Sequence, residues 1–303
     1  MDIELENEIQ KRLHKYHKKM WASYGAIAID ILFLIYMVIF KLDLDICSWS
    51  FGIFGTFLIY VAVFAAYAAI AVLACLLEAF GKLEIEKILF EECDPFLYEA
   101  CAMRIKQPFF KDRVNCNLAV ARYYQGNIDA AYDTLMAINP EKLKREFALN
   151  YYLLLSMIYF QRDMGQQVPE LEQACRRKLS KNKKGQALFA HLCACNNFRR
   201  AMANKDYDAA FGFMQDAATA PNRLFYKLHQ VAYSYDAALL YRAAGEKAST
   251  GWNLDYIAKE GNKLFVVQKA EESLVLKLNA TRGFKPLPHL FFYLNLVSED
   301  NLF

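Results

Sequence analysis

The sequence lacks the signals of β-structure. Period-two alternation of apolar and polar residues, bounded by Asn-Gly or Asp-Gly turns, is missing apart from the brief KLFVV at residues 263–267. From residue 78 onward, apolar residues recur at three- and four-residue steps, as in LEIEKILFEECD at residues 83–94, and this is the spacing of one helix face. Asp94 followed by Pro95 is typical of an N-cap and first turn of the next helix. The sequence therefore predicts an all-α fold.

Catalytic signatures are also missing. The chain contains no HExxH, GxGxxG or GxSxG, and AGEKAST at residues 244–250 lacks the Gly-Lys-Ser/Thr order of a phosphate-binding loop. The five histidines are dispersed, and no RNA- or DNA-binding motif occurs. We therefore expect a protein that is not an enzyme and that uses no cofactor. An enzyme with scattered catalytic residues is the alternative.

Disulfide and metal frameworks are absent as well. The eight cysteines are scattered through apolar segments, which favours buried thiols in a reducing compartment. Only HLCAC, His191 to Cys195, invites comparison with a metal site. On a helix, His191 and Cys195 share a face while Cys193 points elsewhere, and no CxxC or second His pair completes a tetrahedral set. We expect helix packing here and no metal.

Long apolar runs are present, and they are concentrated near the start of the chain. Apolar residues make up 56% of the sequence, against about 45 to 50% in soluble proteins. Residues 24–40 contain a single charge and residues 51–77 contain none, and a membrane helix needs about 20 apolar residues. We expect transmembrane helices at about 22–40 and 51–77, joined by a short external loop at 41–50.

The distribution of basic residues predicts the orientation of this hairpin. Five Lys and Arg residues lie between residues 11 and 19, whereas the connector has only Lys41, so the N-terminal side is expected to be cytoplasmic. The predicted organisation is a basic cytoplasmic segment at 1–20, the two-pass hairpin within 21–80, a cytoplasmic helical domain at 81–278 and an apolar tail at 279–303. A cleaved signal peptide is the alternative, although no small-residue cleavage pattern follows the first run.

The helical domain contains an internal repeat. Breaks between apolar-periodic segments fall at Gly126, Gly165, Lys205 and Gly245, at spacings of 39, 40 and 40 residues. Two of the segments, GNIDAAYDTL and KDYDAAFGFM, align without a gap around the first and third breaks. Small residues there would let two helices approach, and the large apolar positions would fill the layer between neighbouring hairpins.

Two of these units resemble the tetratricopeptide repeat family. The matching positions in the first unit are Leu118, Ala119, Gly126, Ile128, Ala131, Leu135 and Pro140. Those in the other unit are Asp206, Tyr207, Ala210, Met214, Ala217 and Pro221. The remaining units depart from the pattern, with Glu170 and Thr250 where the family has Ala, and the repeat is near 40 residues instead of 34. The resemblance covers about residues 115–262 and implies a divergent α-solenoid of helical hairpins.

The resemblance also implies a concave surface that binds a peptide or helix of another protein. Family motif positions are mostly structural, so Gly126, Ala131 and Ala210 are expected to pack and not to contact a ligand. We expect a membrane-anchored, non-catalytic adaptor or scaffold at the cytoplasmic face. The alternative is a subunit of a transport or secretion complex in which the spans are functional and the repeats regulatory.

Asp30 is the one charge inside the first predicted span. It lies about 12 Å into the span at about 1.5 Å per residue, where a carboxylate costs on the order of 3 kcal/mol and marks a polar contact or a pathway. An antiparallel hairpin would bring it level with Tyr60, whose hydroxyl could donate to it. Structural packing, recognition of a partner and ion transport are the three interpretations.

The second span is rich in small residues. Pairs four residues apart, such as Ala62 with Ala66 and Ala65 with Ala69, permit close helix approach in lipid. Packing within the hairpin explains them, and the alternative is an oligomer or another membrane protein docked on this helix.

A dense basic run follows the second predicted hairpin. It comprises Arg176, Arg177, Lys178, Lys181, Lys183 and Lys184. Such a run is typical of the solvated end of a helix, and contact with anionic lipid headgroups or with nucleic acid are the alternatives. Because no nucleic-acid motif accompanies it, membrane lipids are the expected partner if it binds one.

The C-terminal tail contains PLPHLFFYLNLV at residues 286–297. This stretch is apolar but too short to span a membrane. We expect it to cover the helical domain or to occupy its groove.

Overall fold

The protein is described by a computed structural model that covers residues 3–39, 41–105, 111–219 and 226–278, without the side chains of 37–60, 111, 146 and 274–278. Within these ranges the chain forms twelve α-helices and two short 3-10 turns and no strand, so the predicted all-α fold is confirmed there. The KLFVV stretch leads into a helix and does not form a strand. The apolar tail at 279–303 lies outside the described residues.

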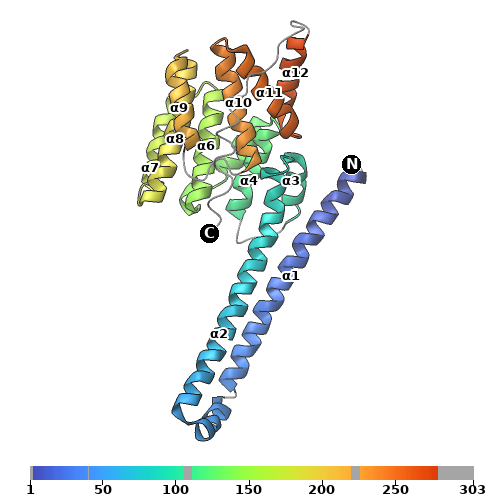
Figure 1. Ribbon diagram of the computed structural model, residues 1–303, viewed down its shortest axis with the longest axis vertical. Coiled ribbons are helices and arrows are strands. Elements are labelled where there is room, and N and C mark those ends of the chain that lie inside the picture. The colour runs from blue at the N-terminus through green and yellow to red at the C-terminus, as the bar shows by residue number, and fades with distance from the viewer. Residues whose placement is uncertain (1–2, 40, 106–110, 220–225, 279–303) are drawn as a thin grey trace. The chain divides into compact units, whose positions relative to one another are not determined.

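The helices follow one another with short connections (Figure 1). Their bounds are α1 Ile3–Ile39, α2 Lys41–Phe90, α3 Pro95–Ala102, α4 Lys111–Tyr124, α5 Ile128–Met136, α6 Arg145–Gln161, α7 Val168–Leu179, α8 Lys183–Ala203, α9 Tyr207–Thr219, α10 Lys227–Ala243, α11 Lys247–Glu260 and α12 Phe265–Leu278. The 3-10 turns are η2 at Pro140–Lys142 and η3 at Gly165–Gln167. The chain divides into two compact units, residues 1–88 with 100–105 and residues 89–99 with 106–303.

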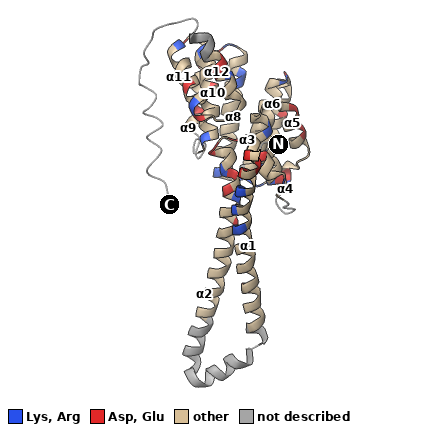
Figure 2. Cartoon of the chain, turned by 90° about the vertical axis from the view of Figure 1, so that its right-hand side faces the viewer, with Lys and Arg blue, Asp and Glu red and all other residues tan. Residues whose placement is uncertain are grey.

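The first unit is built on the antiparallel pair of α1 and α2. Ser23 Oγ donates to the carbonyl oxygen of Ala74 at 2.9 Å, and Lys19 Nζ lies 2.9 Å from Glu84 Oε1. Both helices are long and apolar enough to cross a membrane, over Ile3–Tyr36 and Val61–Phe90. Figure 2 shows that the charged residues gather at the N-terminal end of α1 and the C-terminal end of α2.

The pair extends beyond the apolar runs at both ends. The basic N-terminal segment continues α1 without a break, because Ile9, Leu13, Tyr16 and Met20 form a buried stripe at helical spacing. At the other end, α2 already begins at Lys41, so the residues expected as a loop at 41–50 are helical; no Gly or Pro interrupts them.

The second unit contains four helix pairs followed by α12. Helix α4 packs on α5, α6 on α7, α8 on α9 and α10 on α11, and further contacts join α6 to α8 and α9 to α10. The four pairs correspond to the four segments predicted from the sequence breaks. Ala131 and Ala210, which align in the sequence, are both fully buried, and so is Leu135, while its counterpart Met214 is nearly so.

Each pair turns its corner with the same backbone hydrogen bonds. One residue adopts a left-handed conformation, and these residues are Gly126 (φ 85°), Asp163 (φ 55°), Lys205 (φ 59°) and Gly245 (φ 82°). In every case its N–H donates to the carbonyl three residues back, and the next N–H donates to the carbonyl five residues back. This is the Schellman motif, which satisfies the last carbonyls of a helix.

The second corner differs from the prediction. Asp163, and not Gly165, takes the left-handed position, which Asp tolerates better than most residues. Gly165 instead opens η3, an extra 3-10 turn before α7. Pro169 stands in the first turn of α7, where a missing N–H costs nothing.

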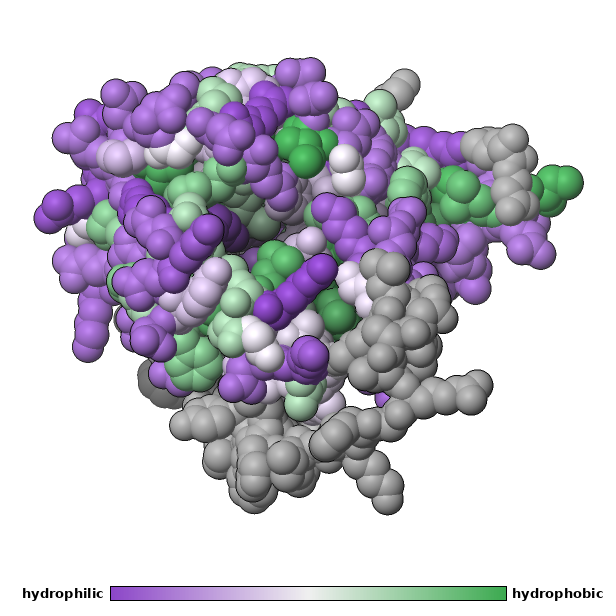
Figure 3. Space-filling model, turned by 90° about the horizontal axis from the view of Figure 1, so that it is seen from above, coloured by the Kyte–Doolittle hydropathy of each residue, from purple (hydrophilic) through white to green (hydrophobic). Residues whose placement is uncertain are grey.

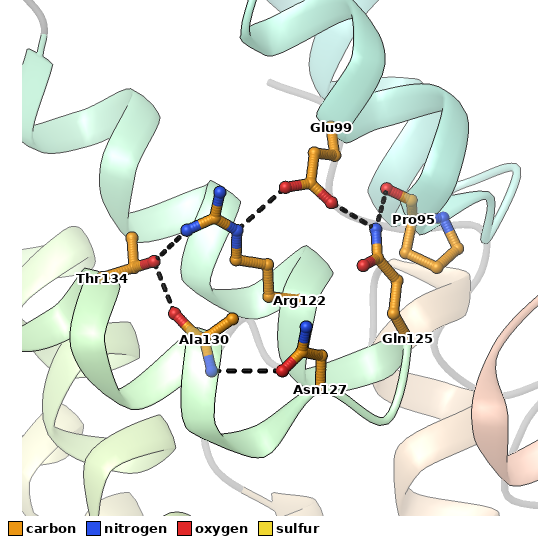
Figure 4. A network of polar contacts seen from close by, with 7 residues as sticks. All are labelled: Pro95, Glu99, Arg122, Gln125, Asn127, Ala130 and Thr134. Carbon is orange, nitrogen blue, oxygen red and sulfur yellow. Dashed lines mark hydrogen bonds and ion pairs between the residues drawn. The ribbon is translucent and has the colours of Figure 1, made fainter.

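A polar network fixes α3 against the first corner (Figure 4). Arg122 donates to Glu99 Oε1 at 2.9 Å and to Thr134 Oγ1 at 2.6 Å, and Gln125 Nε2 donates to Glu99 Oε2 at 2.7 Å. Asp94 caps α3 by accepting from the N–H of Leu97 at 3.0 Å, as the Asp-Pro sequence predicts.

The first and last parts of this unit are in contact. The ring of Phe265, at the start of α12, lies 5.9 Å from that of Tyr123 on α4, centroid to centroid. Lys263 pairs with Asp94 at 2.6 Å, and its N–H donates to the carbonyl oxygen of Cys93 at 3.3 Å. These contacts join residues more than 130 positions apart, so the array of pairs returns on itself.

Candidate functional site

The inner faces of the second unit line an open cavity of about 150 Å³. Helices α6, α8 and α10 each contribute several lining residues. Within each helix these residues are one, three or four positions apart, so they lie on one face of that helix. The lining residues are Phe90, Val120, Tyr124, Asn150, Leu153, Leu154, Met157, His191, Cys195, Phe198, Arg199, Met214, Ala217, Leu228, His229, Ala232, Tyr233 and Asp236. Figure 3 shows hydrophobic side chains in a hollow of the face seen from above, surrounded by hydrophilic ones.

Arg199 and Asp236 are the two charged residues in this wall. Arg199 Nη2 lies 3.9 Å from Asp236 Oδ2, and Arg199 Nη1 donates to the carbonyl oxygen of Cys195 at 3.1 Å. Burial raises the pKa of Asp236, and the nearby Arg199 charge opposes that rise. The Asp236 side chain keeps 34% of its surface exposed and lines the cavity. Its carboxylate receives no hydrogen bond within the described part of the chain.

His191 and Cys195 come together on α8, as their four-residue spacing predicts. His191 Nε2 lies 3.7 Å from Cys195 Sγ, and both residues line the cavity. Burial raises the pKa of the Cys193 thiol nearby. No group of three metal-ligating side chains occurs among the residues that the structure describes.

Three further thiols are buried away from the cavity. Desolvation raises the pKa of Cys93, Cys116 and Cys175 to about 12. They remain protonated near neutral pH, and a protonated thiol is a poor nucleophile and metal ligand. These cysteines therefore serve as packing residues, in keeping with the interpretation of their scattered spacing.

Asp30 is buried between the long helices of the first unit. Its Oδ1 has no hydrogen-bond partner among the described residues. Helices α1 and α2 are antiparallel, and the Ser23–Ala74 hydrogen bond fixes one point of their register. Asp30 lies seven residues after Ser23, and Tyr67 lies seven residues before Ala74, so the register places Asp30 level with Tyr67. The side chain of Tyr60 lies outside the described residues, so its contact with Asp30 stays a prediction.

Four of the small residues of the second span are left exposed. Ala62, Ala65, Ala66 and Ala69 are exposed, whereas Ala74 is buried beside Ser23. Packing within the hairpin therefore does not account for them. They leave a narrow face of α2 open to lipid or to another helix.

The basic run occupies the end of α7, the following turn and the start of α8. Arg176, Arg177, Lys181, Lys183 and Lys184 are exposed. Lys178 differs, because its side chain is largely covered and its Nζ donates to the carbonyl oxygen of Glu141. Lys183 and Lys184 lie in the first turn of α8, where cations do not suit the helix dipole. Five of the six predicted cations are therefore displayed at the surface.

Arg199, His229 and Asp236 are site residues that no sequence motif predicts. Arg199 lies on α8 and the other two residues lie on α10. Each is a polar residue among apolar residues on one face of its helix, and helical periodicity was the signal available for them. It could not show that two separate helices, α8 and α10, turn these residues toward the same interior space.

Comparisons with known proteins give no relative from which a function can be taken. No protein-family model, no curated protein and no solved structure matches this chain.

Proposed function

We propose that this protein is a membrane-anchored helical-repeat adaptor that binds a segment of a partner protein without catalysing a reaction. The observation that supports the proposal is the cavity, whose wall comes from the first helices of all four pairs. Its mostly apolar wall with a few polar groups is the composition of a binding site. The likeness of two units to tetratricopeptide repeats points to the same role.

The two long apolar helices would provide the anchor. Basic residues before the first apolar run favour a cytoplasmic location for the second unit. In that location the exposed cations Arg176, Arg177, Lys181, Lys183 and Lys184 would meet anionic lipid headgroups, each contributing about 1 kcal/mol close to the surface. The open alanine face of α2 would be available to a second copy of the chain.

Site-specific photocrosslinking in native membranes tests the adaptor proposal. A photoreactive residue replaces Ala232, which lines the cavity, and a matched control replaces Ala248, which is exposed on α11. We expect one protein partner to be crosslinked from position 232 and not from position 248. Equal products from the two positions, or none from position 232, would overturn the proposal.

A second candidate function rests on Asp30. A buried carboxylate oxygen without a hydrogen-bond partner in the described part of an apolar helix pair is costly, and such groups mark ion or substrate pathways. In this alternative the chain is a subunit of a transport or secretion complex. Replacing Asp30 by Asn or Leu would then abolish transport while the complex still assembled, whereas an adaptor would keep its partner and its activity.

A further inference from the structure

The carboxylate of Asp236 is the feature of the cavity that calls for a ligand. It lies in a mostly apolar wall. Among the described residues its only ionic contact is the 3.9 Å approach of Arg199, and none of them donates a hydrogen bond to it. The side chain is only partly buried, with 34% of its surface exposed, and it lines the cavity. A donor supplied by the occupant of the cavity would satisfy it.

The charges around Asp236 restrict the kind of donor. An anionic ligand would be repelled by Asp236 itself, although Arg199 would attract it. A cationic ligand would be brought close to the Arg199 guanidinium, which already lies on the carboxylate. Because Asp236 and Arg199 together are close to neutral, a neutral N–H or O–H donor is favoured by both of them.

The size and the wall of the cavity restrict the rest of the ligand. An apolar cavity of about 150 Å³ accepts an aromatic ring. Four aromatic side chains line it, Phe90, Tyr124, Phe198 and Tyr233, and burial raises the pKa of Tyr233 to about 12, so its phenol stays neutral. Aromatic walls pack favourably on another ring, edge to face or offset.

We propose that the cavity binds the indole ring of a tryptophan in the partner segment, with the indole N–H donating to the Asp236 carboxylate. This inference rests on the proposed adaptor function and identifies the residue by which the partner is recognised. Indole combines a large apolar ring with one neutral donor and no acceptor, which suits the mostly apolar wall and the Asp236 carboxylate.

The test uses the intact chain in detergent micelles and 5-fluoroindole as the probe, observed by ¹⁹F NMR. The matched ligand is 1-methyl-5-fluoroindole, which keeps the ring and loses the N–H. We expect at least tenfold weaker binding of the methylated probe to the unmodified chain. Since Ala232→Phe fills the cavity, it should abolish saturable binding and leave only partition into the micelle.

The carboxylate is tested with two replacements. Asp236→Leu removes the acceptor. It should lower the affinity for 5-fluoroindole about tenfold, to that of the unmodified chain for the methylated probe. Asp236→Asn keeps an acceptor oxygen and should retain part of the preference for the free N–H. Circular dichroism shows whether each variant folds. If a variant does not fold, the affinities of the two probes for the unmodified chain still test the proposal.

The outcomes separate this inference from the adaptor proposal. Equal affinity for the two probes, or binding that Ala232→Phe does not change, would overturn the indole assignment. Crosslinking of one partner from position 232 would in that case leave the adaptor function standing. To distinguish a partner's tryptophan from free indole, each tryptophan of the crosslinked segment is replaced by Leu, and loss of crosslinking at one of them is the expected result.

Discussion

Ser23 Oγ donates a hydrogen bond to the carbonyl oxygen of Ala74 at 2.9 Å, and both residues are buried between α1 and α2. This bond sets the register of two long helices that the sequence identifies only as apolar runs. In a membrane, where helices gain little from the hydrophobic effect, such hydrogen bonds help to hold a pair together.

Replacing Ser23 by Ala should weaken the association of α1 with α2. The hydrogen bond is lost and the Ala74 carbonyl keeps its place within its own helix, so we expect a loss of about 0.6 kcal/mol and at most about 1.7 kcal/mol. Unfolding of the intact chain in mixed micelles measures the effect. Gly25→Ala is the control, since a Cβ at Gly25 meets nothing within 4 Å. Equal losses for the two variants would contradict the role of the hydrogen bond.

The same register predicts which residues of α2 lie beside Asp30. A pair of cysteines at positions 30 and 67 should form a disulfide on mild oxidation, because the Ser23–Ala74 bond places them level. A pair at positions 30 and 60 should not, since seven residues of helix separate position 60 from position 67 by about 10 Å. Both pairs are compared in a chain from which Cys47 and Cys75 have been removed. Crosslinking of 30 to 60 alone would show that the register is wrong.

Much of this fold could be predicted from local patterns. The corners at Gly126 and Gly245 were predictable because a break in apolar periodicity coincides with a glycine, which is suited to the left-handed conformation. The corner at Lys205 has no such residue, and it was predictable because KDYDAAFGFM aligns with GNIDAAYDTL. The second corner was misplaced at Gly165, because Asp163 can also adopt that conformation and the extra turn η3 has no strong signal. Local patterns therefore locate helix pairs to within a few residues.

The cavity could not be predicted from local sequence patterns. Its wall depends on the approach of α8 to α10, which brings together residues from separate parts of the sequence. A helix face shows that Asp236 points inward, but not that Arg199 lies opposite. The same limit applies to Asp30, since the depth of a charge along one span does not give the register of the second.

Gly126 should be the most sensitive of the four corners. Its φ of 85° disfavours any side chain, and an added Cβ would lie 3.4 Å from Cβ of Phe265 on α12. We expect Gly126→Ala to lower the free energy of unfolding by about 1 to 2 kcal/mol. The control Gly212→Ala lies inside α9 with nothing within 4 Å, and it should raise stability by about 0.5 to 1 kcal/mol. Thermal or denaturant unfolding measures both. An unchanged free energy of unfolding in Gly126→Ala would contradict the importance of this corner.

The partly buried carboxylate of Asp236 predicts a specific dependence of stability on pH. Burial raises its pKa above the value of 3.8 for an ordinary Asp, so in acid the native state holds this proton more tightly than the unfolded state does. As the pH rises through the window between the ordinary and the raised pKa, the unfolded chain releases the proton first, and the native state loses stability. Below the ordinary value both states are protonated, and the group has no effect there.

Asp236→Asn removes this titration. We expect the stability of the variant, relative to the unmodified chain, to increase as the pH rises from about 4 towards neutral. Urea unfolding of the intact chain at a series of pH values measures the difference, and Asp208→Asn, at an exposed site on α9, supplies a matched control. A difference between Asp236→Asn and the unmodified chain that stays flat over the whole series would mean that the carboxylate titrates as it would in water.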